Sequence, residues 1–129
     1  MLRFLAGIFV ILHGLVHLWY VTLSTRLVEY KPDMGWTGES WLLTSPLGDS
    51  ATRALASGLY VLATLGFVAG GIGLLARQDW RQGVLAASAI LSTAIIILFW
   101  DGNTSMLVQK GLIGVLINVG VMLALYALK

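Results

Sequence analysis

The sequence predicts an all-α fold, a four-helix transmembrane bundle with up-down-up-down order, and composition is the first observation behind this prediction. Of the 129 residues, 58% are hydrophobic and 11% are charged, whereas an average soluble domain is about 45–50% apolar and about 25% charged. A domain of this size has too much surface for its volume to bury so many apolar side chains in water. We therefore expect one integral membrane domain, residues 1–129, covered mostly by lipid.

Four long apolar segments are the second observation. A helix needs about 20 mostly apolar residues to cross the roughly 30 Å hydrocarbon core of a bilayer. Backbone polar groups in lipid must find their partners within the segment, which a helix provides. The expected helices are Leu2–Ser24, Thr52–Ala76, Arg81–Trp100 and Met106–Leu128.

The first of these segments superficially resembles a secretory signal peptide, because Arg3 precedes an apolar run. A cleaved signal has an apolar core of about 7–15 residues followed by a small-residue site. Here the run continues to Leu23 and ends near Tyr20, Thr22 and Ser24. We expect it to be retained as a helix, with the Arg3 side chain reaching the lipid headgroups.

The first connection, residues 25–51, is the longest and the most polar. It holds both prolines of the chain, four acidic residues, Trp36 and Trp41. The stretch Ser40–Leu43 is too short to span a membrane, and we expect it to form an interfacial turn of helix because tryptophan favours the headgroup level. The loop is predicted to lie as a lid over one end of the bundle.

The other two connections, residues 77–80 and 101–105, are short and therefore predict antiparallel neighbours. Both termini then share one face with Arg3, Arg77 and Arg81. The opposite face has as many basic residues, but those of the first face lie in very short segments. We favour the first face as cytoplasmic, in a bacterial-type inner membrane. Asp101 is expected to form a turn with Gly102 or to pair inward with Arg53 or a histidine.

Several function classes find no support in the composition. The chain has no cysteine, which excludes disulfides, thiolate metal sites and thiol redox chemistry. The net charge of +2 comes from basic residues scattered at the helix ends, so a nucleic-acid interface is not supported. No catalytic motif is present, and we predict no catalytic residues.

A polar stripe on the first helix is the main candidate site. His13, His17, Tyr20 and Ser24 follow one another at steps of four, three and four residues, which places them on one face of a helix with 3.6 residues per turn. His13 lies near the middle of its segment.

The other three helices also carry polar groups near their midpoints, and polar side chains in membrane helices usually face the bundle interior. We therefore predict a polar pocket at mid-membrane depth. Its candidate ligand-binding residues are His13, His17, Tyr20, Thr64, Ser88, Ser92 and Asn118.

Three interpretations of this pocket stay open. A quinone or another flat amphipathic ligand fits hydrogen-bonding groups among apolar side chains, and it implies a redox partner that the protein serves as an accessory. In the structural alternative, the polar groups bind no ligand and only join the helices through hydrogen bonds, such as one from His13 to Asn118. Haem or metal binding is less favoured, because His13 and His17 share one side of one helix and no intramembrane acid adds a ligand; no metal residues are predicted.

Glycines give the rival functional hypothesis. Gly66 and Gly70 form a GxxxG step, which permits close helix approach. Packing within the chain is the favoured interpretation, and a homodimer or a membrane protein partner is the other. A structural or assembly protein without a ligand, or a small transporter that dimerises, is therefore an alternative function.

The opening residues Arg3–Gly7, followed by Leu12–His17 and a glycine-rich second helix, resemble the DoxX-like family of small four-helix bacterial membrane proteins. The ending Phe99–Asp101 and Asn118 are similar to features of small membrane proteins around that family. The resemblance implies a four-helix membrane bundle, in some members associated with quinone-linked oxidoreductases such as thiosulfate:quinone oxidoreductase. It carries over only His13 and His17 as candidate pocket residues.

Overall fold

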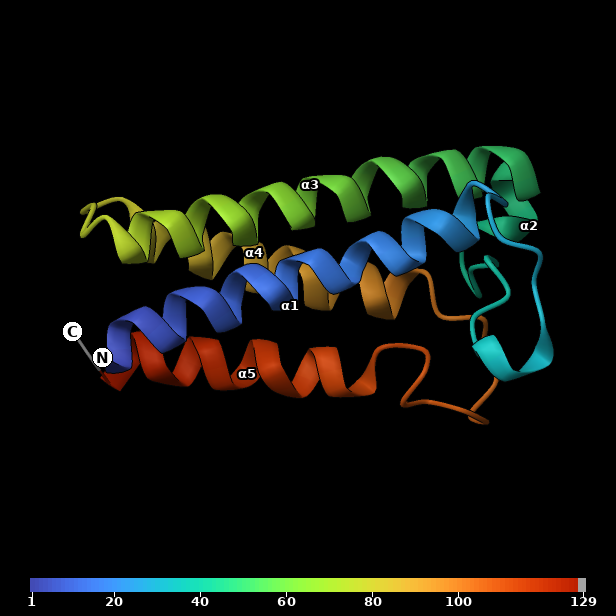
Figure 1. The fold of residues 1–129 in the computed structure, drawn as a ribbon. Coiled ribbons are helices and arrows are strands. Elements are labelled where there is room, and N and C mark those ends of the chain that lie inside the picture. Colours follow the sequence, from blue (N-terminus) through green and yellow to red (C-terminus); the bar gives the residue numbers. More distant parts are fainter. Residues whose placement is uncertain (128–129) are drawn as a thin grey trace.

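Residues 1–127 are described by a computed structural model, which is all-helical with no strand in that range. The long helices are α1 (Leu2–Ser24), α3 (Asp49–Leu75), α4 (Arg81–Leu98) and α5 (Leu112–Ala127), and they lie side by side (Figure 1). The first loop adds two short elements, η1 (Pro32–Met34) and α2 (Thr44–Leu47). The all-α prediction is confirmed.

Three of the long helices, α1, α3 and α4, are long and apolar enough to cross a membrane. The fourth, α5, is apolar but has 16 residues, about 24 Å at a rise of 1.5 Å per residue. Leu128, the predicted last residue of this helix, and Lys129 lie outside the described residues. The helices point to an integral membrane protein, and the face that is cytoplasmic stays a prediction.

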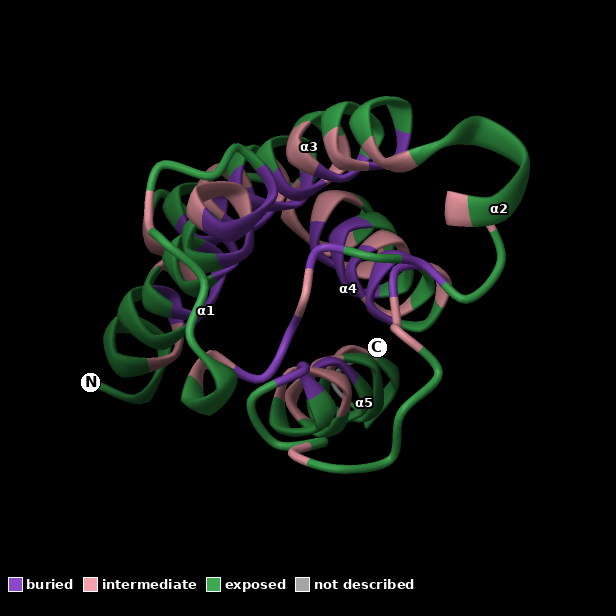
Figure 2. Ribbon diagram, turned by 90° about the vertical axis from the view of Figure 1, so that its right-hand side faces the viewer, coloured by how far each residue is buried: buried purple, intermediate pink, exposed green. Residues whose placement is uncertain are grey.

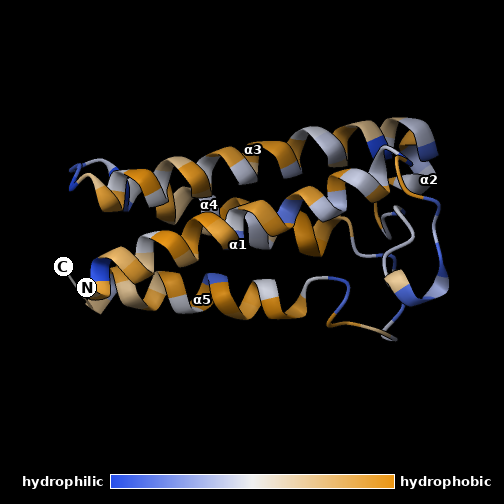
Figure 3. Cartoon of the chain, viewed as in Figure 1, coloured by the Kyte–Doolittle hydropathy of each residue, from blue (hydrophilic) through white to orange (hydrophobic). Residues whose placement is uncertain are grey.

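The outer surface of the four helices is apolar along its middle. Each long helix carries there a large apolar side chain that is more than half exposed, namely Leu12, Leu62, Ile90 and Leu116. Buried residues face the interior (Figure 2), and hydrophilic residues gather at the two ends (Figure 3). Apolar patches of this extent mark a surface that something other than water covers, and lipid fits both its extent and its polar borders.

Close packing of the helix backbones runs in chain order, α1 on α3, α3 on α4 and α4 on α5, while α1 and α5 are joined through side chains such as His13 and Asn118. Glycines make the first two contacts close. A Cβ atom added to Gly71 would lie 2.9 Å from the carbonyl oxygen of Gly7, and one added to Gly14 would meet Phe67. Gly66 lies against Ser88. The glycine faces of α1 and α3 are thus used within the chain, as the favoured interpretation predicted.

We expect Gly71→Ala to lower the free energy of unfolding by about 1–3 kcal/mol, because the methyl group pushes against the backbone of α1. Gly58→Ala in the same helix is the matched control, since nothing lies within 4 Å of its added Cβ atom. Alanine favours helix by about 0.8–1.0 kcal/mol over glycine, so this variant should be the more stable one. Thermal unfolding in mild detergent measures both, and similar effects of the two changes would contradict the packing described.

The boundaries of α3 and α4 differ slightly from the prediction. α3 begins at Asp49 rather than at Thr52, because Asp49 accepts a bond from Arg53 Nε at 2.9 Å, one turn later, and an acid in the first turn suits the helix dipole. α4 ends at Leu98 rather than at Trp100. Its last carbonyl groups turn outward to donors from the first loop.

That loop caps the end of α4. The final carbonyls of a helix have no partner within it, and four donors from the loop bond to the last two carbonyls of α4 and to the two that follow. Trp41 Nε1 donates to Ile97 O at 2.9 Å, Ser40 Oγ to Leu98 O at 2.5 Å, Trp36 Nε1 to Phe99 O at 2.6 Å and Trp41 N to Trp100 O at 2.7 Å. The loop therefore covers one end of the helices, as predicted for a lid, and residues 41–43 form turns rather than a helix.

α5 begins at Leu112 rather than at Met106, because the preceding residues turn inward. Met106 and Gly111 have positive φ angles of 55° and 109°, and Lys110 points into the protein to pair with Asp101 at 3.0 Å. Both side chains of this pair are buried, with 4% and 6% exposure. Asp101 Oδ1 also accepts a bond from Asn103 N, so the predicted turn is confirmed, while its partner is Lys110 and not Arg53 or a histidine.

Lys110→Met is expected to cost about 3–5 kcal/mol of stability, because it leaves a buried carboxylate without its partner. The double variant with Asp101→Asn should recover part of the loss, since no buried charge remains. Lys31→Met removes a charge from an exposed lysine and serves as the control. Equal melting temperatures for the Lys110 and Lys31 variants would show that the pair does not stabilise the fold.

Candidate functional site

Four of the seven predicted site residues meet in one hydrogen-bonded group, which we call the polar cluster. His13 and His17 come from α1, Ser92 from α4 and Asn118 from α5. None of the four is more than 7% exposed. Their common depth, inferred from their positions in the segments, is confirmed by direct contact.

The direction of the bonds around His17 follows from simple donor chemistry. His17 Nδ1 lies 3.1 Å from His13 O and 3.2 Å from Gly14 O, and a carbonyl oxygen can only accept. Nδ1 therefore carries the proton and Nε2 has the lone pair. The Ser92 hydroxyl, 2.6 Å away, must then donate to His17 Nε2.

The same logic continues to Asn118. Its Nδ2 donates to Ser92 Oγ at 2.9 Å and to Thr93 Oγ1 at 3.1 Å, so its Oδ1, which can only accept, receives the proton of His13 Nε2 at 3.0 Å. His13 Nδ1 is left as an acceptor, with no bond recorded among residues 1–127. Since no fully buried side-chain nitrogen or oxygen in that range lacks a partner, this atom keeps some accessible surface.

The polar cluster thus joins three helices and is nearly complete without a ligand. The bond from His13 to Asn118 is the one expected of groups that hold helices together. A ligand that reached the polar cluster would find one atom ready to bond, the acceptor His13 Nδ1. The ligand-binding role of the seven residues stays a prediction.

The other three predicted residues do not join the polar cluster. Thr64 Oγ1 donates to Tyr60 O at 3.0 Å and Ser88 Oγ to Val84 O at 2.7 Å, each within its own helix. Tyr20 OH donates to Gln109 O at 3.3 Å, beyond the end of α4. Sequence spacing placed Tyr20 on the correct face but did not show that it serves the loop end.

Tyr20 belongs to an aromatic cluster with Trp36, Tyr60 and Phe99. The rings of Tyr20 and Tyr60 stack with centroids 4.9 Å apart, and Trp36 lies 5.8 Å from both. Trp36 is 2% exposed and Phe99 is 1% exposed. The aromatic cluster fills the space between the polar cluster and the loop, so the interior is closed at that end.

The opposite end holds a cavity of about 580 Å³, here called the terminal cavity. All four long helices border it, and α1 and α5 form its open side, since their backbones do not pack closely on each other. Its lining is mostly apolar, with small residues on two walls. The lining residues used below are Arg3, Phe9, Val10, Arg81, Gly120 and Val121.

The inner end of the terminal cavity adjoins the polar cluster. On α1, His13 follows Val10 by one helical turn, and on α5 Val121 follows Asn118 by one turn. The Phe9 ring also stacks on His13 with centroids 6.5 Å apart. The cavity itself is lined by none of the seven predicted residues. It was not predicted because it depends on the spacing of α1 and α5, which no sequence pattern shows.

No group of three or more metal-binding side chains occurs in the part of the chain that the structure describes. The ring nitrogens of His13 and His17 that form hydrogen bonds have Asn118, Ser92 and backbone carbonyls as partners. Ligation by either ring would break bonds that connect the helices.

Comparison with models of protein families, with curated proteins and with solved structures found no match to this chain. The resemblance to the DoxX-like family therefore stays a prediction.

We expect Asn118→Leu to lower stability by about 2 kcal/mol, since its three bonds to other helices are worth on average about 0.6 kcal/mol each in a membrane protein. Thr64→Val should have a much smaller effect, because the hydroxyl bonds only to its own helix. Denaturation in detergent micelles compares the two, and a Thr64 variant as unstable as the Asn118 variant would contradict this assignment.

Proposed function

We propose that the protein is a four-helix integral membrane protein that binds an amphipathic membrane molecule in the terminal cavity. The observation that supports this most is the cavity itself, about 580 Å³ in volume and bordered by all four long helices. Ligand sites commonly measure about 300–1,000 Å³ and are mostly apolar. In this proposal α5 also crosses the membrane, and local thinning of the bilayer accommodates its short length.

The open side of the cavity gives the ligand a route from the bilayer. Phe9 lines the cavity and is 51% exposed, so the cavity faces the outside of the bundle between α1 and α5. A molecule dissolved in the membrane can enter sideways without passing through water. Gly120 on α5 has no side-chain carbon, and nothing lies within 4 Å of a Cβ atom added there, which leaves room for the ligand.

A quinone is the redox-active member of this ligand class, and the resemblance to the DoxX-like family favours it. Because a quinone exchanges electrons with another centre, this version makes the protein an accessory subunit of a quinone-linked system. The ring would lie at the inner end, beside His13. Since His13 Nδ1 accepts a hydrogen bond, it suits the hydroxyl of a reduced quinone better than the carbonyl of an oxidised one.

Gly120→Leu should block ligand binding. Gly120 lines the cavity and has open space beside it, so the leucine side chain would occupy part of the cavity. We expect affinity for a fluorescent fatty acid, cis-parinaric acid, to fall about five-fold or more, since overfilling a site costs about 1–3 kcal/mol. Fluorescence titration of the purified protein in mild detergent measures this. Displacement of the probe by a short-chain quinone or quinol tests the redox version.

Gly58→Leu is the matched control for this experiment. Gly58 is exposed on α3, does not line the cavity and has nothing within 4 Å of an added Cβ atom. The control should bind the probe like the unaltered protein. Unchanged binding by the Gly120 variant, with its fold retained, would refute the proposed site.

A further inference from the structure

The terminal cavity is basic at its outer end, near the starts of α1 and α4, and we call this end its mouth. Arg3 from α1 and Arg81 from α4 both line it, and no acidic residue does. Neither arginine takes part in the ion pairs found among residues 1–127. The one bond recorded for the Arg81 side chain runs from Nη1 to Gln78 O at 2.6 Å, so most of its donors are available to a ligand.

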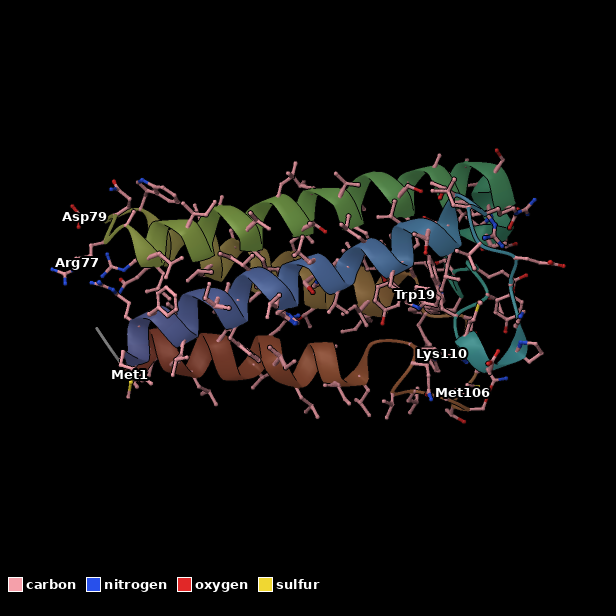
Figure 4. All side chains as sticks on the ribbon, in the orientation of Figure 1. Met1, Trp19, Arg77, Asp79, Met106 and Lys110 are labelled. Atoms are coloured by element: carbon pink, nitrogen blue, oxygen red, sulfur yellow. The ribbon has the colours of Figure 1, made fainter. Side chains whose placement is uncertain are left out.

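Among residues 1–127, no acidic group pairs with either of these arginines. Asp79 lies in the turn between α3 and α4 together with Arg77 (Figure 4), and both are exposed. Arg3 and Arg81 each stand in the first turn of a helix that has no acid there. A cation in that position is unfavourable next to the positive end of the helix dipole unless an anion is also present. The mouth is therefore suited to a negatively charged group.

We infer that the occupant of the terminal cavity is an anionic membrane lipid, with its phosphate between Arg3 and Arg81 and an acyl chain inside. This inference rests on the proposed function and names the class of its ligand. The guanidinium groups match a phosphate in charge and in hydrogen-bond geometry. From Arg3 to Val10 the cavity follows α1 for about 10 Å at 1.5 Å per residue, which gives the order that such a lipid needs, charge at the membrane surface and apolar walls below it.

A neutral quinone fits this end less well. It brings no charge to the two arginines, and its ring would lie at the inner end, where the polar cluster leaves only the acceptor His13 Nδ1 without a bond. A zwitterionic lipid brings a phosphate together with a cation that the same arginines repel. The charge at the mouth therefore selects an acidic headgroup over both.

The test compares phosphatidylglycerol and phosphatidylcholine with identical acyl chains, offered in equal amounts to the full-length protein in mild detergent. Native mass spectrometry counts the bound lipids. We expect phosphatidylglycerol to be retained preferentially, and the double variant Arg3→Gln and Arg81→Gln to lose that preference. At about 1 kcal/mol for each arginine near an anionic lipid, the loss should be about five-fold per residue.

Arg77→Gln is the matched control, because it removes the same charge from the same end of the molecule but lies outside the cavity lining. It should keep the preference. Equal retention of the two lipids by the unaltered protein, or equal loss in the Arg77 variant, would overturn the inference. Loss of both lipids in Gly120→Leu, with no headgroup preference in the unaltered protein, would leave the proposed function standing and reject only the lipid class. No effect of Gly120→Leu on either lipid would reject the proposed function itself.

Discussion

Lipid tails are as apolar as leucine, so the hydrophobic effect cannot hold α5 against the other helices once they are in a membrane. The backbone of α5 packs closely on α4 but not on α1, and its buried polar residue is Asn118. That side chain bonds to His13 on one side and to Ser92 and Thr93 on the other. Asn118 therefore joins α5 to both α1 and α4 at mid-length, and these bonds add to the packing of α5 on α4 in fixing the position of α5.

Polar contacts at the loop end also hold α5 in place. The donors that cap α4 and the buried pair of Lys110 with Asp101 both fix the segment that enters α5. The loop thereby anchors the start of α5, Asn118 anchors its middle, and the terminal end is left less constrained. The terminal cavity lies at that end, where no side-chain hydrogen bond joins α5 to the other helices among residues 1–127.

Much of this arrangement could be predicted from sequence, because a membrane restricts the choices. Apolar length gave the α1 boundaries without change, and counting along the segments placed His13 level with Asn118. The start of α5 could not be found in this way. Lys110 interrupts an apolar run and its partner Asp101 is local, but the choice between extending the helix and burying the ion pair depends on the space under the loop. Thr64 and Ser88 show the opposite error, since depth alone cannot tell a hydroxyl that bonds within its own helix from one that crosses to another.

The aromatic cluster closes the interior of the bundle to molecules that would pass from one end of the helices to the other. Trp36, Tyr60 and Phe99 are almost wholly buried, and they stand with the polar cluster between the terminal cavity and the loop. The terminal cavity is closed at its inner end, so a molecule bound there as proposed would enter and leave through the same opening. Such a shape suits a protein that holds or presents a molecule, and a conduit from one side of the membrane to the other would first have to unstack Tyr20 from Tyr60.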